Sequence, residues 1–193
     1  MPDSVHLRVH HFQPESRANG PGCRAVLWVQ GCTLGCLGCF NPGTHDPRGG
    51  DLWAVDDLVV RLAALQTHIQ GLTVSGGEPL QQPKALFILL QRLRAAMQLS
   101  VLVFTGFTWE EVQRLPNGPA ILAHIDVLIA GRYDASQRLA HGLLGSVNQR
   151  VHFLTGRYSP AELAGVPEAE VTITPQGELW LSGIAPLNFD SAR

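Results

Sequence analysis

Long hydrophobic runs, an excess of charge of either sign and internal repeats are all missing from this chain. No apolar run approaches the roughly 20 residues that a membrane-spanning helix needs, and the first residues, MPDSVHLRVHHFQ, lack the basic and then apolar pattern of a secretion signal. The 14 Lys and Arg nearly balance the 16 Asp and Glu, which gives no indication of nucleic-acid binding. With 193 residues, 45% of them apolar, the chain is expected to form a compact globular protein of the cytoplasm that binds neither membranes nor nucleic acids.

Cysteine is scarce as well, with four residues in all, yet three of them share the short stretch GCTLGCLGCFN. Cys32, Cys36 and Cys39 have the spacing C-x3-C-x2-C. Thiolates of cysteine are the usual ligands of a 4Fe-4S cluster, and a complete set needs four of them. Three thiolates leave one iron open, and an open coordination position is what distinguishes a reactive metal site from a structural one. The loop therefore predicts a 4Fe-4S cluster that binds a further ligand at iron.

Two simpler interpretations of the cysteines stay open. A buried helical stripe would also place them on one face, but glycines at positions 31, 35 and 38 disfavour a helix. A zinc site would need a fourth ligand, for which only Cys23 and His45 are near in the sequence. On its own, Cys23 is expected to be a small buried apolar residue and His45 a solvated loop residue. A noncatalytic iron-sulfur or zinc binding module is therefore one hypothesis for the whole chain.

The remaining pattern predicts alternating strands and helices. Expected in order are a buried strand at 25–30, a helix over 52–69, a strand at 72–74, a helix from Pro83 to about position 97, a strand at 101–104, a short helix capped by Thr108 and Glu111, and a strand at 125–129. This order implies an α/β fold with a mostly parallel sheet covered by helices.

Every unusual loop in this order follows a strand. Ligands of parallel α/β folds bind at the carboxyl ends of the strands. The cysteine loop is therefore expected to meet three other segments on one face: the turn of Ser75, Gly76, Gly77 and Glu78, the turn of Thr105 and Gly106, and Arg132.

The stretch LTVSGGEPL is the second motif. Paired glycines allow the backbone to approach a ligand, and Glu78 offers an acceptor for an ammonium group. A Gly-Gly segment between strand and helix can also be only a turn, with Glu78 favoured by the positive end of the helix.

With both motifs in view, the chain resembles the radical S-adenosylmethionine superfamily, whose members share the C-x3-C-x2-C loop and a Gly-Gly-Glu-Pro turn. The resemblance implies a partial (β/α) barrel in which Cys32, Cys36 and Cys39 bind the cluster and the open iron takes the amino and carboxylate groups of S-adenosyl-L-methionine. It implies that one electron from the cluster cleaves this cofactor into methionine and a 5'-deoxyadenosyl radical, which abstracts hydrogen. The resemblance implies that the backbone of Phe40 binds adenine and that Gly76, Gly77 and Glu78 bind the methionyl amino group. Ser75 and Thr105, which belong to the converging loops, are also expected to bind the cofactor.

Within this superfamily the chain is most similar to the glycyl-radical activases of the anaerobic ribonucleotide reductase type. The similarity covers most of residues 19–151 and rests on NGPGCRAVLWVQGC, CFN, SGGEPLQQP, VFTGFTWEE, IDVLIAGRYD and GSVNQR. It implies hydrogen abstraction from a glycine of a partner glycyl-radical enzyme, with electrons from a reduced flavodoxin- or ferredoxin-type donor. The alternative is a radical S-adenosylmethionine enzyme that modifies another peptide or a small molecule.

Two features depart from the family. Ala130 stands where related activases often have an aspartate that helps hold a monovalent cation, and Asp126 is the nearest possible substitute. Arg132, two positions later, agrees with the family, which has Lys or Arg there. It could form a bidentate contact with the methionyl carboxylate or only a surface ion pair.

The second departure is the tail. We expect residues 1–155 to form the core domain and residues 156–193 an extension packed on it. Ser159, Pro160 and Glu162 predict a capped helix start, and residues 171–174 and 178–181 predict a β-hairpin around Pro175, Gln176 and Gly177. The hairpin could cover a sheet edge or dock a different partner. Trp109 and Trp180 are expected to be packing residues, although Trp180 could anchor a partner.

Overall fold

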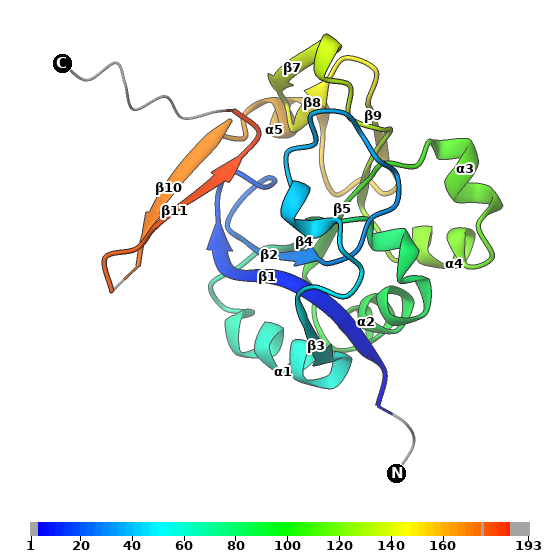
Figure 1. Cartoon of the computed structure of the whole chain (residues 1–193). Coiled ribbons are helices and arrows are strands. Elements are labelled where there is room, and N and C mark those ends of the chain that lie inside the picture. Colours follow the sequence, from blue (N-terminus) through cyan, green and yellow to red (C-terminus); the bar gives the residue numbers. More distant parts are fainter. Residues whose placement is uncertain (1–3, 175, 186–193) are drawn as a thin grey trace.

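The computed structural model describes residues 4–174 and 176–185, and its centre is an open seven-stranded sheet (Figure 1). The strand order is β3-β1-β2-β4-β5-β6-β9. These strands are β1 (His6–Ser16), β2 (Arg24–Val29), β3 (Asp51–Ala54), β4 (Gly71–Gly76), β5 (Ser100–Thr105), β6 (Val127–Ala130) and β9 (Arg150–Phe153).

Parallel pairing is confined to the middle of the sheet. The neighbours β2 and β4, β4 and β5, and β5 and β6 are parallel, whereas β1, β3 and β9 run antiparallel to their neighbours. The predicted α/β fold with a largely parallel central sheet is therefore confirmed, and the open edges at β3 and β9 agree with a partial rather than a closed barrel. The antiparallel strands β1, β3 and β9 were not predicted. Residues 52–54, expected to be helical, form most of β3 because they pair with β1.

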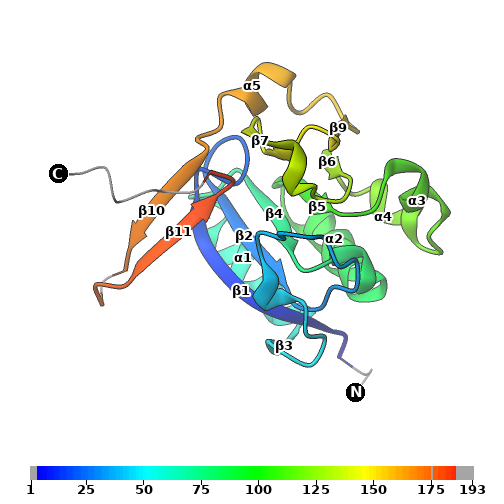
Figure 2. The same cartoon turned by 45° about the horizontal axis from the view of Figure 1, so that its top comes forward.

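Helices cover one face of the sheet, which we call the helix face (Figure 2). The two long helices are α1 (Val55–Leu65) and α2 (Pro83–Ala96), and they pack on each other. The shorter α3 (Trp109–Arg114) and α4 (Gly118–Leu122) follow β5. Thr108 and Glu111 form the predicted capping box at the start of α3. Burial of the apolar stripes of α1 and α2 against alternate strand residues such as Leu27, Val74 and Val103 builds the main core, as expected for amphipathic helices on a sheet.

The opposite face, which we call the cavity face, is covered by loops and by the end of the chain. A second apolar cluster lies over β5 and β6, where Leu102 and Ile129 meet Leu143 and Leu163. Leu163 belongs to α5 (Pro160–Ala164), which begins with the predicted capping box of Ser159 and Glu162. The small strands β7 (Arg138–His141) and β8 (Leu144–Ser146) pair with each other nearby. This cluster leaves the part of the cavity face over β2 and β4 for a site.

The predicted C-terminal hairpin is present, with strands β10 (Ala169–Ile173) and β11 (Leu179–Gly183) paired antiparallel. Of its expected turn, Pro175 lies outside the described residues. Among the described residues the hairpin pairs with no strand of the main sheet, because β10 and β11 form a separate two-stranded sheet. Its Glu170 and Thr172 side chains instead contact Gln13 of β1, beyond the part of β1 that pairs with β3, so the covering of this edge stays a prediction. The hairpin contacts β1 and the loop after it, where the Glu170 carboxylate accepts from Arg17 N at 2.8 Å. The Glu170 carboxylate therefore fixes the hairpin beside the cavity face.

No helix among the described residues is long and apolar enough to cross a membrane.

Candidate functional site

The cysteine loop begins where β2 ends, at the carboxyl edge of the parallel strands. Cys32, Cys36 and Cys39 are all half-buried free thiols, and all three line one small cavity of about 120 Å³, which we call the smaller cavity. Gly35 and Gly38 have φ angles of +65° and +72°, which exclude a regular helix here. The prediction that glycines make this segment a loop is therefore confirmed, and the loop brings three thiol groups to one place.

The Gly-Gly turn after β4 is hydrogen-bonded to the start of the cysteine loop. Gly77 N donates to Val29 O at 2.8 Å, and Glu78 N donates to Gly31 O at 2.9 Å. A Cβ atom on Gly77 would lie 2.4 Å from Gly31 O, which is closer than real Cβ contacts come. The close approach that the glycine pair allows is thus first of all an approach to the cysteine loop, while Gly76 and Gly77 still line the smaller cavity.

We expect Gly77→Ala to cost about 1–3 kcal/mol of unfolding free energy, because either the turn or the cysteine loop must shift to make room for the methyl group. The shift separates the cysteines from the rest of the cavity, so the iron content after reconstitution should fall too. Urea unfolding and iron analysis measure both effects. Gly156→Ala is the matched control, since its Cβ would meet nothing within 4 Å. Equal stability and equal iron content in the two variants would show that the close approach of Gly77 to Gly31 is not important.

Glu78 lies beneath the same cavity and is 1% exposed. Its carboxylate accepts from Leu80 N at 2.9 Å, from the Thr105 hydroxyl at 2.8 Å and from Gly106 N at 2.8 Å. Burial raises the pKa of Glu78 to about 7, although these three neutral donors favour the charged form. Glu78 therefore ties the turn after β4 to the turn after β5 and carries a charge that changes near neutral pH.

The pKa of Glu78 predicts a pH-dependent stability. The native carboxyl, with a pKa of about 7, holds its proton over a range in which an unfolded glutamate, with an ordinary value of 4.5, has lost it. Stability should therefore fall as the pH rises from about 4.5 to about 7, by about 3 kcal/mol from this group. Glu78→Gln should remove that part of the slope. Urea unfolding at several pH values before metal is loaded tests this, and parallel curves for the two proteins would contradict it.

The smaller cavity is completed by the ends of β5 and β6. Its lining includes Thr105, Gly106 and Gly131, and Gly106 packs so closely on Leu34 of the cysteine loop that a Cβ atom would lie 2.4 Å from the Leu34 side chain. The predicted meeting of the cysteine loop with the turns after β4 and β5 is confirmed. The physical reason is the one used to predict it, namely that parallel strands end at the same edge.

Arg132 does not line the smaller cavity, although its neighbours Gly131 and Tyr133 do. Its guanidinium makes two contacts with the Glu111 carboxylate, at 2.8 and 3.1 Å, and this hydrogen-bonded arginine lowers the pKa of Glu111. Of the two roles expected for Arg132, the structure contains the ion pair. The contact with a methionyl carboxylate stays a prediction.

The suggestion that Asp126 replaces the missing carboxylate at Ala130 is wrong. Asp126 precedes β6 at its amino end, whereas the smaller cavity lies beyond the carboxyl end of the same strand. Its carboxylate accepts from Arg94, Val101 N and Thr155, each at 2.7 Å, and these hydrogen bonds and the Arg94 charge lower its pKa despite burial. Asp126 therefore links α2, β5 and the segment after β9 at the amino end of β6.

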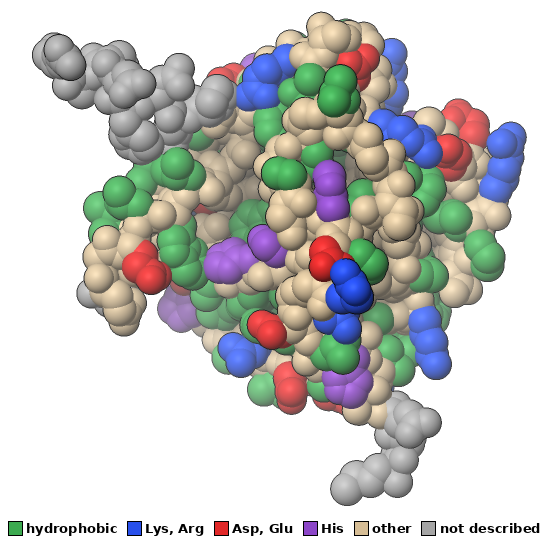
Figure 3. Space-filling model, viewed as in Figure 1, with side chains coloured by type: hydrophobic (Ala, Val, Ile, Leu, Met, Phe, Trp, Pro, Cys, Tyr) green, Lys and Arg blue, Asp and Glu red, His purple; other side chains and the backbone are tan. Residues whose placement is uncertain are grey.

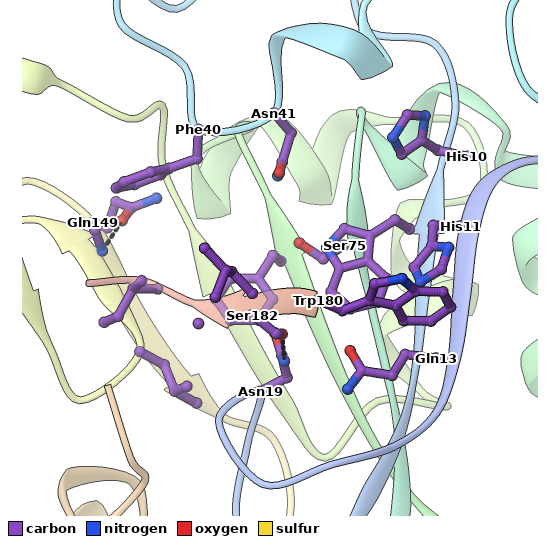
Figure 4. A pocket seen from close by; sticks show the side chains of 17 residues that line it. His10, His11, Gln13, Asn19, Phe40, Asn41, Ser75, Gln149, Trp180 and Ser182 are labelled. Carbon is purple, nitrogen blue, oxygen red and sulfur yellow. Dashed lines mark hydrogen bonds between the residues drawn. The ribbon is translucent and has the colours of Figure 1, made fainter. Parts of the chain in front are cut away.

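A second, larger cavity of about 430 Å³ adjoins the first on the cavity face (Figure 4). Phe40, Asn41 and Ser75 line both cavities. Phe40 packs on Tyr133, with ring centroids 4.4 Å apart, which holds the end of the cysteine loop against the loop after β6. The other side of the larger cavity is formed by the hairpin, with Trp180 pointing toward it in the figure. A ligand in the smaller cavity therefore has open space beside it that runs under the hairpin.

Two glutamines that were not predicted hold this region in place. Gln30, 3% exposed, donates to Gly43 O at 3.1 Å and to Asp46 O at 2.8 Å, so it joins the end of β2 to the returning part of the cysteine loop. Gln149 accepts from Gly145 N at 2.9 Å and donates to Gly131 O at 3.0 Å. Gln149 belongs to the motif GSVNQR, which the sequence singled out without indicating a role for the glutamine. Gln30 is a lone glutamine at the end of a strand, and such a residue gives no signal in the sequence.

The donor set around the smaller cavity fits a 4Fe-4S cluster. Three free cysteines line it from one loop, and thiolates are the ligands that such clusters use. Among the described residues, no three His, Cys, Asp or Glu side chains lie close enough together to hold one single metal ion. Cys23 lies before β2, at the end of the strand remote from the loop, and is buried as expected. His45, expected to be solvated, is half-buried and lines the cavity, so of the two predicted candidates for a fourth zinc ligand His45 is the one that lies beside the three cysteines.

One comparison with known proteins, the family model, agrees with this donor set. The family model described as "4Fe-4S single cluster domain" matches residues 18–152. The anaerobic ribonucleoside-triphosphate reductase-activating protein of Enterobacteria phage T4 is 34% identical over 149 residues, which are 75% of this chain and 93% of that protein. The protein of the same name from Vibrio cholerae is 31% identical over 157 residues, 77% of this chain and 99% of its own length. The crystal structure of QueE from Escherichia coli aligns with a TM-score of 0.43 at 18% identity, covering 53% of this chain and 54% of that one.

Proposed function

Because the chain belongs to the 4Fe-4S single cluster domain family and to the family of anaerobic ribonucleoside-triphosphate reductase-activating proteins, we propose that it is a radical S-adenosylmethionine enzyme. Its substrate in this proposal is a glycine of an anaerobic ribonucleoside-triphosphate reductase, on which it leaves a glycyl radical. Its electron comes from a reduced flavodoxin- or ferredoxin-type protein.

One observation carries the proposal: three free cysteines, the Gly-Gly-Glu turn and the turn of Thr105 line the same small cavity. Cys32, Cys36 and Cys39 would hold three irons of the cluster and leave the fourth for the cofactor. When bound, the cluster and S-adenosyl-L-methionine supply a one-electron cleavage into methionine and a 5'-deoxyadenosyl radical, which becomes 5'-deoxyadenosine by taking a hydrogen atom.

The residues around the cavity would orient that cofactor. The backbone of Gly76 and Gly77 and the remaining acceptor capacity of Glu78 suit the methionyl ammonium group, because a carboxylate accepts more than the three hydrogen bonds that Glu78 receives. Phe40 and Ser75 lie where the smaller cavity opens into the larger one, which suits the adenosine part. Thr105 would act through Glu78. Arg132 could contact the carboxylate only after leaving Glu111.

The test is anaerobic reconstitution with iron and sulfide, followed by reduction in the presence of S-adenosyl-L-methionine and the reductase. The expected products are 5'-deoxyadenosine and, by electron paramagnetic resonance, a glycyl radical on the reductase in similar amounts. A protein that takes up zinc instead of iron and forms no 5'-deoxyadenosine would overturn the proposal and leave a noncatalytic binding module.

A second candidate function is favoured by the extra C-terminal segment. The alignments with the two relatives cover nearly all of those proteins but leave about a quarter of this chain unmatched. Together with Ala130, this supports a radical S-adenosylmethionine enzyme that acts on another peptide or on a small molecule. Such an enzyme would form 5'-deoxyadenosine in the same experiment without a glycyl radical on the reductase.

A further inference from the structure

The end of the cysteine loop is held by an arginine from the small strand β7. Arg138 places its guanidinium over the Phe40 ring, with Cζ 4.9 Å from the ring centroid. The same guanidinium donates to the Tyr133 hydroxyl at 3.3 Å and to Ile184 O at 3.0 Å. Arg138 therefore connects the cysteine loop, the loop after β6 and the segment after β11.

The Arg138 side chain is exposed, and both of its hydrogen-bond acceptors are uncharged. Figure 3 shows basic side chains on the surface around β7 and β8, at the top of the view. Replacing an exposed side chain of this kind usually changes the stability of a fold very little. The consequence of its contacts is therefore to be sought in the placement of the groups that it touches.

The Phe40 ring is enclosed on two further sides. One side packs on Tyr133, and another lies so close to β8 that a Cβ atom on Gly145 would be 2.6 Å from the ring. Gly145 N donates to the Gln149 side chain at 2.9 Å, so this strand is itself fixed. With the ring held between Arg138, Tyr133 and Gly145, the backbone of Phe40 is held as well.

The turn between β7 and β8 keeps Arg138 in this place. Ala140 and Leu143 have φ angles of +54° and +68°, a conformation that residues other than glycine rarely adopt. Such a conformation persists where the surroundings hold it. Here Leu143 is 2% exposed and packs with Leu102 and Ile129 over the sheet. The two strands therefore form a fixed base for the Arg138 side chain.

The C-terminal segment supports the same two strands. Ile184 O accepts from Arg138, and the Glu168 carboxylate lies 3.3 Å from the His141 ring of β7. Both acceptors lie beyond residue 152, where the match to the family model ends. In this chain the segment outside that match therefore braces the strands that carry Arg138.

We propose that Arg138 is a positioning residue for S-adenosyl-L-methionine. The inference rests on the proposed function, together with the expectation that the backbone of Phe40 binds the adenine of that cofactor. Arg138 lines neither cavity, so it acts through the Phe40 ring, which follows directly after Cys39. A backbone that is already held in place loses less freedom when the cofactor binds, and the affinity is higher for that reason.

The test replaces Arg138 by methionine, which has a similar length but neither charge nor donors. The dissociation constant of S-adenosyl-L-methionine is measured from the change that it causes in the electron paramagnetic resonance spectrum of the reduced cluster. We expect this constant to rise about fivefold, the factor that corresponds to the loss of an exposed cation–π contact. Iron content, thermal unfolding and the rate of 5'-deoxyadenosine formation at saturating cofactor should stay unchanged.

Two further variants make the test specific. Arg157→Met is the matched control, since Arg157 is also exposed and donates to a backbone carbonyl, Gln98 O, at 3.1 Å. It should keep the dissociation constant of the unmodified protein. Phe40→Leu removes the ring but keeps the backbone. If Arg138 acts through that ring, Arg138→Met should weaken binding no further in the Phe40→Leu protein.

An unchanged dissociation constant in Arg138→Met would overturn the inference. Effects of Arg138→Met and Phe40→Leu that multiply would do so too, because Arg138 would then act independently of the ring. Loss of iron from Arg138→Met would also count against it, since the cysteine loop as a whole would then depend on Arg138. Failure of the proposed function looks different: the reconstituted, unmodified protein would show no spectral change with S-adenosyl-L-methionine, before any variant is made.

Discussion

Cys36→Ala is expected to lose the iron-sulfur cluster and all formation of 5'-deoxyadenosine. Cys36 is the middle one of the three cysteines that line the smaller cavity. Without its thiolate only two protein ligands remain for a cluster that usually has four, and the described residues offer no other cysteine at this cavity. The expected result is a loss of the cluster's visible absorption and of product to the background level, while the fold is retained because the side chain is only half-buried.

The fourth cysteine supplies the control for this experiment. Cys23 is 6% exposed, and its thiol is 3.9 Å from the Glu15 carboxylate. Burial, and after it the charge of Glu15, raises the pKa of Cys23. Cys23→Ala should therefore keep the cluster and the product. A Cys36→Ala protein with the full iron content, or a folded Cys23→Ala protein without it, would show that the cluster is not held by the cysteine loop.

Features that depend on residues close together in the sequence could be predicted. The capping boxes of Thr108 with Glu111 and of Ser159 with Glu162 involve contacts over three positions, and both are present. The cysteine loop is non-helical because its glycines adopt positive φ angles. The convergence of the loops on one cavity followed from the order of strands and helices alone, since this order fixes which strand ends meet.

Features that depend on pairing between distant segments could not be predicted in the same way. Leu52 fits the apolar spacing of the following helix, but it pairs with Arg8 of β1 and so lies in a strand. β1 itself is long and antiparallel to β2, with two register shifts that blur its alternation. The larger cavity depends on Trp180 and His11 meeting from opposite ends of the chain. No local pattern contains that information.

A buried arginine is the most unusual member of the cavity face. Arg24, at the start of β2, is 0% exposed, and its guanidinium donates to the Thr73 hydroxyl at 2.8 Å, to Leu72 O at 2.9 Å and to the Ser100 hydroxyl at 2.9 Å. It also donates to the Tyr158 hydroxyl at 3.0 Å. None of these acceptors carries a charge. Burial lowers the pKa of Arg24, yet a guanidinium stays protonated in proteins, so the neutral acceptors solvate a full charge.

We expect Arg24→Ala to cost about 3–5 kcal/mol of unfolding free energy, because it leaves a cavity and several buried acceptors without donors. Arg24→Met separates the two causes, since methionine fills much of the volume but donates nothing. Arg92→Ala is the control: Arg92 is exposed and pairs with Asp56 on the surface, where an ion pair contributes about 1 kcal/mol or less. Urea unfolding measures all three. Arg24→Met with the stability of the unmodified protein would mean that only packing matters at this position.

The destabilisation caused by replacing Arg24 should also reach the hairpin, because hydrogen bonds connect Arg24 to it. The Thr73 hydroxyl that accepts from Arg24 donates to Asn19 O at 2.7 Å, and the Asn19 amide donates in turn to Ser182 of β11. Tyr158 extends the same network into the segment that leads to α5. We therefore expect hydrogen exchange in β10 and β11 of Arg24→Met to accelerate more than exchange in α2, which Arg24 does not contact. Equal acceleration throughout would indicate global destabilisation, and the hairpin would then be held by its own contacts with β1 alone.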